Sequence, residues 1–393
     1  MEGTAPVTFV DLGRDWAEVD GEARRRIDGV LESQIFVGGP ETVQLEESLA
    51  RLVGSSHAVA CSSGSDAIYL SLLALGLGPG DAVLVPSFTF FATAGAVVRA
   101  GARPVFVDLD PETFNSGPGR FEAAIEAEFE GPPGQRRHRR SGQRLAALLP
   151  VHLFGRLADL EGLVSLARSE QVHMIEDAAQ AIGARGSDGG AGTVGDTGCL
   201  SFYPTKNLGG AGDGGMVLTG QAEMAARLRR LRTHGVGEQA YLHSEVGINA
   251  RMGELQAAVL NAKLDRLEAW TRARADLASL YRQGLTALAA AGRLGLGEDA
   301  DFPQHVYHQF AVRVFDGRDR VREQLAAAGV QTAVFYPLPL HLQSCMSEFG
   351  YRPGDLPAAE QAAAEVLCLP IHPGLAVGDV DRVCAALASA LAV

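Results

Sequence analysis

The sequence predicts an α/β fold with a mostly parallel sheet covered by helices on both faces, followed by a smaller α+β domain. Two observations carry this prediction. Short apolar runs alternate with longer helical patterns through the first half of the 393-residue chain, which is typical of βαβ units. Near Arg251 the pattern changes to one long helical stretch followed by isolated strands and short helices. We therefore expect a large domain over residues 1–254 and a smaller one over residues 255–393.

The elements of the first half follow from short apolar runs bounded by glycine or proline, which predict buried strands. The expected strands are 57–60, 82–85, 104–107, 145–151, 172–175 and 199–202. Pro86 ends the second of these strands. Ile68, Leu72 and Leu75 form a helical stripe that ends at Gly76, and a second helix is expected over 91–100.

The second half begins with a helical pattern over 254–275, in which Leu255, Val259, Leu264 and Leu267 recur at roughly helical spacing. Later elements are expected as a strand at 310–314 and helices at 318–328 and 380–391.

Composition excludes several classes of protein. The net charge of −13 argues against nucleic acid as the main partner, because phosphate binding favours a basic surface. The five cysteines contain no CxxC pair, which argues against a disulfide framework or a zinc site and favours reduced thiols in the cytoplasm. No apolar signal segment opens the chain, and no run of 18 apolar residues predicts a membrane span. We interpret the Arg-rich segment 131–144 as a solvated surface loop, with a nucleic-acid patch as the alternative.

The chemistry is predicted from Lys206 and Asp177. Asp177 ends an apolar run, and ligands gather at strand ends in open α/β sheets. Lys206 follows the strand at 199–202 and precedes a glycine-rich stretch. A lysine amine forms a Schiff base with pyridoxal phosphate (PLP), and a carboxylate keeps the pyridine nitrogen protonated. Alone, Lys206 would be read as a surface lysine.

Two features add a place for the cofactor phosphate. Ser201 lies five residues before the lysine. Ser63, Gly64 and Ser65 stand between a strand and a helix start, where backbone N–H groups and the helix dipole favour an anion. The same three residues are equally typical of a helix N-cap, and the two interpretations are compatible.

Other motifs carry weaker signals. Phe90 follows a strand and is a candidate to stack on the pyridine ring, although core packing is the commoner role. The GxGxxG match at 190–195 neither follows a strand nor opens a helix, so we reject a dinucleotide site. No histidine spacing predicts a metal site. His341, in a Pro-rich loop, is a candidate substrate contact or a histidine without a role, with equal support.

These segments together resemble the DegT/DnrJ/EryC1/StrS sugar aminotransferases, which are fold-type I PLP enzymes with a seven-stranded sheet in the large domain. The matching segments are 63–67, 78–81, 104–108, 176–180, 201–208, 212–215, 231–235, 249–258 and 336–341. They occur in order over nearly the whole chain, so the resemblance is specific.

The resemblance implies a role for each matching residue. Lys206 is the Schiff-base lysine and proton carrier, and Asp177 pairs with the pyridine nitrogen. The remaining cofactor contacts implied are Ser63, Gly64, Ser65, Phe90, Gln180, Ser201 and Asn249. Asn249 is expected to reach the phosphate of the neighbouring subunit, which implies a homodimer with shared active sites. The substrate contacts expected are Tyr203, Arg251, Tyr336 and His341.

Three departures from the family pattern stand out. Ser65 replaces the commoner threonine and keeps the hydroxyl. Gly253 replaces the usual aspartate, and the Arg-rich insertion at 135–144 is not typical.

The resemblance implies transfer of an amino group from L-glutamate (or glutamine) to a nucleotide-linked keto sugar, expected to be a dTDP-3-keto-6-deoxyhexose. Lys206 argues against the dehydratases of the family, which carry histidine at this position. The Tyr-Pro-Thr-Lys-Asn-Leu-Gly version at 203–209 favours amination at C3 or C2. The alternative acceptors are a UDP-3-keto sugar, a 4-keto sugar and a keto-cyclitol. An alternative function is that of a regulator that binds PLP without turnover.

Overall fold

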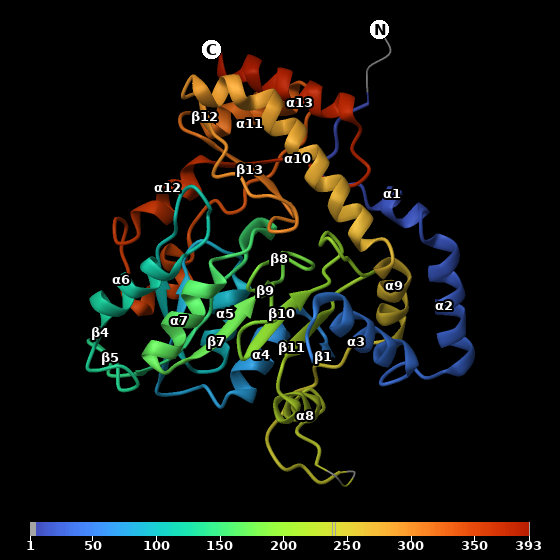
Figure 1. The fold of residues 1–393 in the computed structure, drawn as a ribbon, viewed down its shortest axis with the longest axis vertical. Helices are drawn as coiled ribbons and strands as arrows, with labels where there is room; N and C mark the ends of the chain where they lie inside the picture. Colours follow the sequence, from blue (N-terminus) through green and yellow to red (C-terminus); the bar gives the residue numbers. More distant parts are fainter. Residues whose placement is uncertain (1–4, 238, 240, 393) are drawn as a thin grey trace.

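A central sheet of seven strands in one continuous path organises the computed structural model, which describes residues 5–237, 239 and 241–392 (Figure 1). In spatial order the strands are β1 (His57–Cys61), β11 (Gly215–Thr219), β10 (Thr197–Ser201), β7 (His173–Asp177), β6 (Arg144–Leu148), β2 (Asp81–Pro86) and β3 (Arg103–Val107). The pairs from β10 to β3 are parallel, and β11 runs antiparallel to both of its neighbours. The mostly parallel sheet predicted from the sequence is confirmed.

Helices cover both faces of this sheet, because successive side chains of each strand point to opposite sides. Val83 and Val85 of β2 pack in the core on one face of the sheet, whereas Ala82 and Leu84 pack in the core on the opposite face. The helices of the first core are α4 (Gly64–Ala74), α5 (Ala92–Arg99) and α8 (Ala222–Leu231). Those of the opposite face are α6 (Pro118–Glu128), α7 (Leu160–Glu170), α3 (Pro40–Val53) and α9 (Glu254–Leu264). Strands buried on both sides explain the near-continuous apolar runs of the sequence.

A smaller body follows, built on a three-stranded antiparallel sheet. Its strands are β12 (Leu294–Gly295), β13 (Phe310–Val314) and β14 (Val366–Leu369), and its helices are α10 (Leu267–Ala290), α11 (Arg318–Ala327) and α13 (Val377–Leu391). Val7, near the start of the chain, packs in this core and pairs with Val330. The α+β character predicted for the C-terminal part is confirmed.

The single helical stretch expected over 254–275 is two helices. α9 ends at Leu264 and α10 begins at Leu267, with Asp265 and Arg266 between them. α9 packs against α3 and against α2 (Asp20–Ser33), whereas α10 packs against α13. α9 thus packs with helices of the first half of the chain and α10 with a helix of the second half, and the domain boundary expected after residue 254 stays a prediction.

The Arg-rich segment forms a small hairpin of β4 (Phe129–Glu130) and β5 (Arg137–His138), in which Arg137 pairs with Arg144, the first residue of β6. Its arginines are used within the fold. Arg136 binds the Glu170 carboxylate at 2.9 Å, and Arg139 donates to carbonyl oxygens in the last turn of α6. Cations are stabilising at a helix C-terminus. The segment predicted as a surface loop between a helix and a strand is therefore held by the ion pair of Arg136 and the hydrogen bonds of Arg139.

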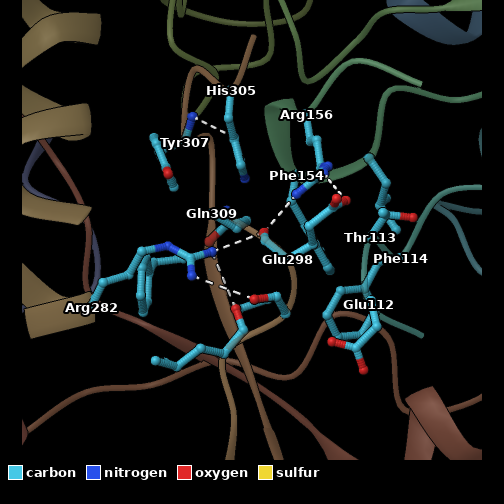
Figure 2. Close-up of a pocket in the computed structure, with 15 residues that line it drawn as sticks. Glu112, Thr113, Phe114, Phe154, Arg156, Arg282, Glu298, His305, Tyr307 and Gln309 are labelled. Carbon is cyan, nitrogen blue, oxygen red and sulfur yellow. Dashed lines mark hydrogen bonds and ion pairs between the residues drawn. The ribbon is translucent and has the colours of Figure 1, made fainter. Parts of the chain in front are cut away.

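The two bodies meet at a small cavity of about 30 Å³ (Figure 2). The backbone oxygen of Glu298 accepts from Arg156 of the first body at 2.6 Å and from Arg282 of α10 at 2.9 Å. The Glu298 N–H donates to the Glu112 carbonyl at 2.8 Å. These bonds fix the second body against the segment around Phe154, which is also part of the candidate site.

Candidate active site

Lys206 lies in a turn that follows β10, and its N–H donates to the Tyr203 carbonyl at 2.8 Å. Burial lowers the pKa of the Lys206 amine to about 8, and the nearby Asp177 charge opposes this shift only in part. A lysine becomes a nucleophile only when its amine is neutral. The fold therefore makes this amine easier to deprotonate near neutral pH, which suits the covalent role that the sequence predicts for it.

Asp177 ends β7, the parallel neighbour of β10, so both residues belong to the carboxyl ends of adjacent strands. Its side chain is 5% exposed and is held by two hydrogen bonds. The Thr93 hydroxyl donates to Oδ2 at 2.7 Å, and the Ala179 N–H donates to Oδ1 at 3.1 Å. Thr93 carries no motif, and the sequence offered no signal for this role.

The predicted phosphate cradle is the N-terminus of α4. Ser63 is the N-cap, and its hydroxyl accepts from the Asp66 N–H at 3.1 Å. The first N–H groups of a helix have no partner inside it, so those at Gly64 and Ser65 remain for a ligand. A Cβ at Gly64 would lie 2.7 Å from Cβ of Ser201, which shows how closely β10 and the helix start approach. The structure brings the three expected phosphate contacts together.

One acidic residue lies in this first turn and would oppose an anion. Asp66 accepts from the Ser62 hydroxyl at 2.5 Å and pairs with Arg99 at 2.5 Å. The guanidinium offsets the carboxylate charge, so the cradle keeps its preference for a phosphate.

Together these features fit PLP. An amine with a lowered pKa, a buried carboxylate and an anion-binding helix start lie at one end of one sheet. When bound, the cofactor supplies the electron sink, and the protein supplies position and protons. The Phe90 ring is 55% exposed and lies 6.1 Å from the ring of Tyr336, so an open aromatic surface adjoins these groups.

Gln180 is held in one orientation. Its Oε1 accepts from the Phe154 N–H at 2.7 Å, so Nε2 faces the Tyr336 hydroxyl at 3.1 Å. Phe154 reaches this position with a φ of +59°, a left-handed conformation that is uncommon outside glycine. The amide can therefore only donate on its free side, which suits the phenolate oxygen of the cofactor.

Three other predicted residues lie at the surface of this single chain. Tyr203 is 53% exposed, and the exposed Arg251 side chain donates to the Asn249 amide oxygen at 3.0 Å. Ala250, between them, accepts from the Ser62 N–H at 3.0 Å, which ties this segment to the start of the cradle. Their expected roles toward substrate and a second subunit stay predictions.

His341 is not placed like a substrate contact. The side chain is 1% exposed. Nδ1 lies 2.6 Å from the Ser87 hydroxyl, and Nε2 lies 3.2 Å from the Glu360 carboxylate. Both ring nitrogens have partners, and His341 packs between its Pro-rich loop and the sheet. A Pro-rich loop gave no sign of this burial.

The GxGxxG match at 190–195, which we rejected as a dinucleotide site, binds the Glu176 carboxylate. The N–H groups of Gly192, Val194 and Gly195 donate to Glu176 at 2.7–2.8 Å. His152 Nδ1 accepts from a backbone N–H, so its Nε2 carries the proton and donates to Glu176 at 2.9 Å. Burial raises the pKa of Glu176, but these hydrogen bonds outweigh it and lower the pKa overall. This network anchors β7 beside Asp177.

The sequence profile of the DegT/DnrJ/EryC1/StrS aminotransferase family matches residues 17–388. The chain belongs to this family. It is therefore a PLP-dependent aminotransferase, and the fold, activity and cofactor expected from the sequence are confirmed.

Relatives in this family extend over almost the whole chain. A UDP-N-acetyl-3-dehydro-α-D-glucosamine 3-aminotransferase of Acidithiobacillus ferrooxidans is 40% identical, covering 98% of this chain and 97% of the relative. A dTDP-3-amino-3,4,6-trideoxy-α-D-glucose transaminase of Streptomyces venezuelae is 41% identical, covering 95% and 93%. The structure of NtdA from Bacillus subtilis, solved with bound cofactor PMP, is 31% identical with a TM-score of 0.90, covering 100% of this chain and 86% of NtdA. The family thus includes enzymes named for nucleotide-linked sugars.

Two other predictions concern metals and membranes. Among the residues that the structure describes, no three His, Cys, Asp or Glu side chains gather as metal ligands. In the same part of the chain, no helix has both the length and the apolar character needed to cross a membrane.

Proposed function

We propose that this aminotransferase moves the amino group of L-glutamate to the keto group of a dTDP-3-keto-6-deoxyhexose. The observation that carries the proposal is Lys206, a buried amine with a pKa near 8, beside Asp177 and the α4 phosphate cradle. Two relatives named for an amino group at carbon 3 favour C3 as the aminated position. They differ in nucleotide, so a UDP-3-keto sugar is the second candidate acceptor.

The residues of the chain divide the work between holding and proton transfer. Each half of the reaction moves one proton across one face of the cofactor, and general acid–base catalysis is most effective when the pKa lies near the working pH. The Lys206 amine meets that condition once it is free. Asp177 and Gln180 are held rigidly by their own hydrogen bonds, so they orient the cofactor rather than carry the proton.

A homodimer with shared active sites is part of the proposal. Phe90, Phe91 and Tyr203, each 42–55% exposed, leave apolar surface beside the candidate site. Exposed aromatic surface of this kind marks interaction sites. A second subunit that covers it would bring its Asn249 toward the cradle.

The shared site can be tested by complementation. Lys206→Ala and Asn249→Ala proteins should each be inactive, and mixed dimers should regain activity, because one of their two sites has both native residues. Mixed dimers without activity would show that each site uses a single chain.

The amino-donor reaction is tested by visible absorbance. The purified protein with PLP should absorb at roughly 400–430 nm, a property of the bound cofactor, and L-glutamate should shift this band to the ultraviolet with release of 2-oxoglutarate. Lys206→Ala is the control without the covalent link. A band that glutamate leaves unchanged would reject glutamate as the donor, and no band at all would reject the cofactor site.

A further inference from the structure

The turn that carries Lys206 is bound from two sides. On one side, Lys263 of α9 donates from Nζ to the Gly209 carbonyl at 2.6 Å. On the other, the side chain of Asn207 binds the segment 306–309, which directly precedes β13. Consecutive Cα atoms lie about 3.8 Å apart across a trans peptide, so whatever holds Asn207 also restricts the backbone of the lysine. The sequence assigned no role to Asn207.

The Asn207 side chain is 6% exposed and uses both ends of its amide. Nδ2 donates to the Val306 carbonyl at 2.9 Å, and a carbonyl only accepts, so the orientation of the amide is fixed. Oδ1 therefore faces Nδ1 of His308 at 3.3 Å, and this ring nitrogen carries the proton. Nε2 of the same ring is left to accept from the Gln309 amide at 3.4 Å. The three bonds form one chain in which each donor meets an acceptor.

His308 stays neutral in this chain. Burial keeps the pKa of His308 well below its usual value, and the charges of Lys206 and Arg274 lower it further. A neutral imidazole has one N–H, and the bond to Asn207 uses it. The pattern of donors and acceptors is therefore the same on both sides of the Lys206 pKa of about 8.

The segment 306–309 is itself bound to the part of the chain that orients Gln180. Two of its N–H groups donate to the carbonyls of Phe154 and Gly155, at 3.2 and 2.9 Å. A Cβ at Gly155 would lie 2.9 Å from a backbone nitrogen of this segment, so the two stretches of chain are in close contact. The Phe154 N–H in turn donates to Gln180. Asn207 is thus attached to a fixed support that also orients Gln180.

We propose that Asn207 is a positioning residue for Lys206, because its amide fixes the backbone beside the lysine to the segment 306–309. The inference rests on the proposed function, in which Lys206 is the reacting residue. Without this amide the turn keeps its bond to Lys263, but the lysine can shift relative to the cofactor. A shift of ~1 Å at a reacting centre can cost roughly 100-fold in rate. We therefore expect the loss in the reaction of the amine and not in the phosphate cradle.

The test separates the position of the lysine from the binding of the cofactor. The neutral Lys206 amine attacks the aldehyde carbon of PLP; a C=N bond forms, and the aldehyde oxygen leaves as water with the two amine protons. The rate at which the band at roughly 400–430 nm appears after apoprotein is mixed with saturating PLP measures this step. Pyridoxine 5′-phosphate carries an alcohol in place of the aldehyde, so its dissociation constant reports on binding alone. In Asn207→Leu the rate should fall about tenfold or more, whereas this dissociation constant should stay unchanged.

Asn261→Leu is the matched control. Asn261 of α9 is 7% exposed, and its amide also makes two hydrogen bonds, to the carbonyl and the carboxylate of Glu41 at 2.9 and 2.6 Å. Both substitutions remove a buried amide of the same size, so they should lower the melting temperature by similar amounts. The control should leave the rate of band formation and the dissociation constant unchanged.

Asn207→Ala is the second variant, because a water can replace the missing amide beside the Val306 carbonyl, which leucine leaves without a donor. It should show the same slow reaction and decides the question where Asn207→Leu does not fold. A wild-type rate in a folded Asn207 variant would overturn the inference. An equal loss of pyridoxine 5′-phosphate binding, or an equal slowing in Asn261→Leu, would overturn it as well. If the wild type forms no band with PLP, the proposed function fails; if it does and the Asn207 variants match its rate, only this inference fails.

Discussion

Replacing Gly64 with alanine places a methyl group where the structure leaves no room. Its Cβ would lie 2.7 Å from Cβ and 3.3 Å from Cα of Ser201. Ordinary contacts between carbon atoms are roughly 3.5–4.0 Å, so the start of α4 has to move away from β10 by about 1 Å. Overpacking of this size costs about 1–3 kcal/mol. Because the displaced N–H groups form the phosphate cradle, PLP affinity should fall roughly 5- to 150-fold.

The assay is a titration of the apoprotein with PLP, followed by absorbance, together with thermal unfolding. Gly29→Ala is the matched control, because Gly29 lies in α2 with no atom within 4 Å of its added Cβ. Alanine in a helix interior is favoured over glycine, so the control should unfold at the same or a higher temperature and bind PLP normally. If Gly64→Ala binds PLP within twofold of the wild type, the cradle is not at the start of α4.

Three further predictions follow from the same site. The pKa of Lys206 is near 10.5 in the unfolded chain and about 8 in the folded apoprotein, so the unfolded chain binds more protons between these pH values. The free energy of unfolding of the apoprotein should therefore rise by roughly 3 kcal/mol from pH 8 to pH 10.5. Denaturant unfolding measures this rise, which should be smaller in Lys206→Met. Thr93→Val removes the hydroxyl that donates to Asp177, so kcat should fall about tenfold with little change in melting temperature. An unchanged kcat would show that Asp177 does not depend on this hydrogen bond. Glu176→Gln places amide hydrogens against the backbone donors and His152. The substitution should lower the free energy of unfolding, measured with denaturant, by about 3–5 kcal/mol. A loss below about 1 kcal/mol would contradict the role of this buried network.

The sequence predicted the parts of the site that carry local signals. Lys206 and Asp177 each follow an apolar run, and the pairing of β7 with β10 brings those runs side by side. Ser63 to Ser65 combine a helix-start signal with small residues, which is also what an anion cradle requires. In these cases the local pattern and the global fold agree.

The parts that the sequence did not show depend on long-range packing. Thr93 meets Asp177 only because α5 follows β2 at the same end of the sheet. His341 is buried by Ser87 and Glu360, which are distant in sequence. The break after Leu264 interrupts a pattern that is helical on both sides, and packing of α9 against α2 and α3 determines where the chain turns.

The central claim is tested most directly by following the amino group itself. The enzyme would be incubated with L-glutamate isotopically labelled at its amino nitrogen and with dTDP-3-keto-6-deoxyhexose, and the nucleotide sugar would be analysed by mass spectrometry, with Lys206→Ala as control. The account predicts one labelled nitrogen in the sugar of the wild-type reaction and none with Lys206→Ala. Consumption of glutamate without label in this sugar, and equally in a parallel incubation with a UDP-3-keto sugar, would contradict the proposed acceptor class.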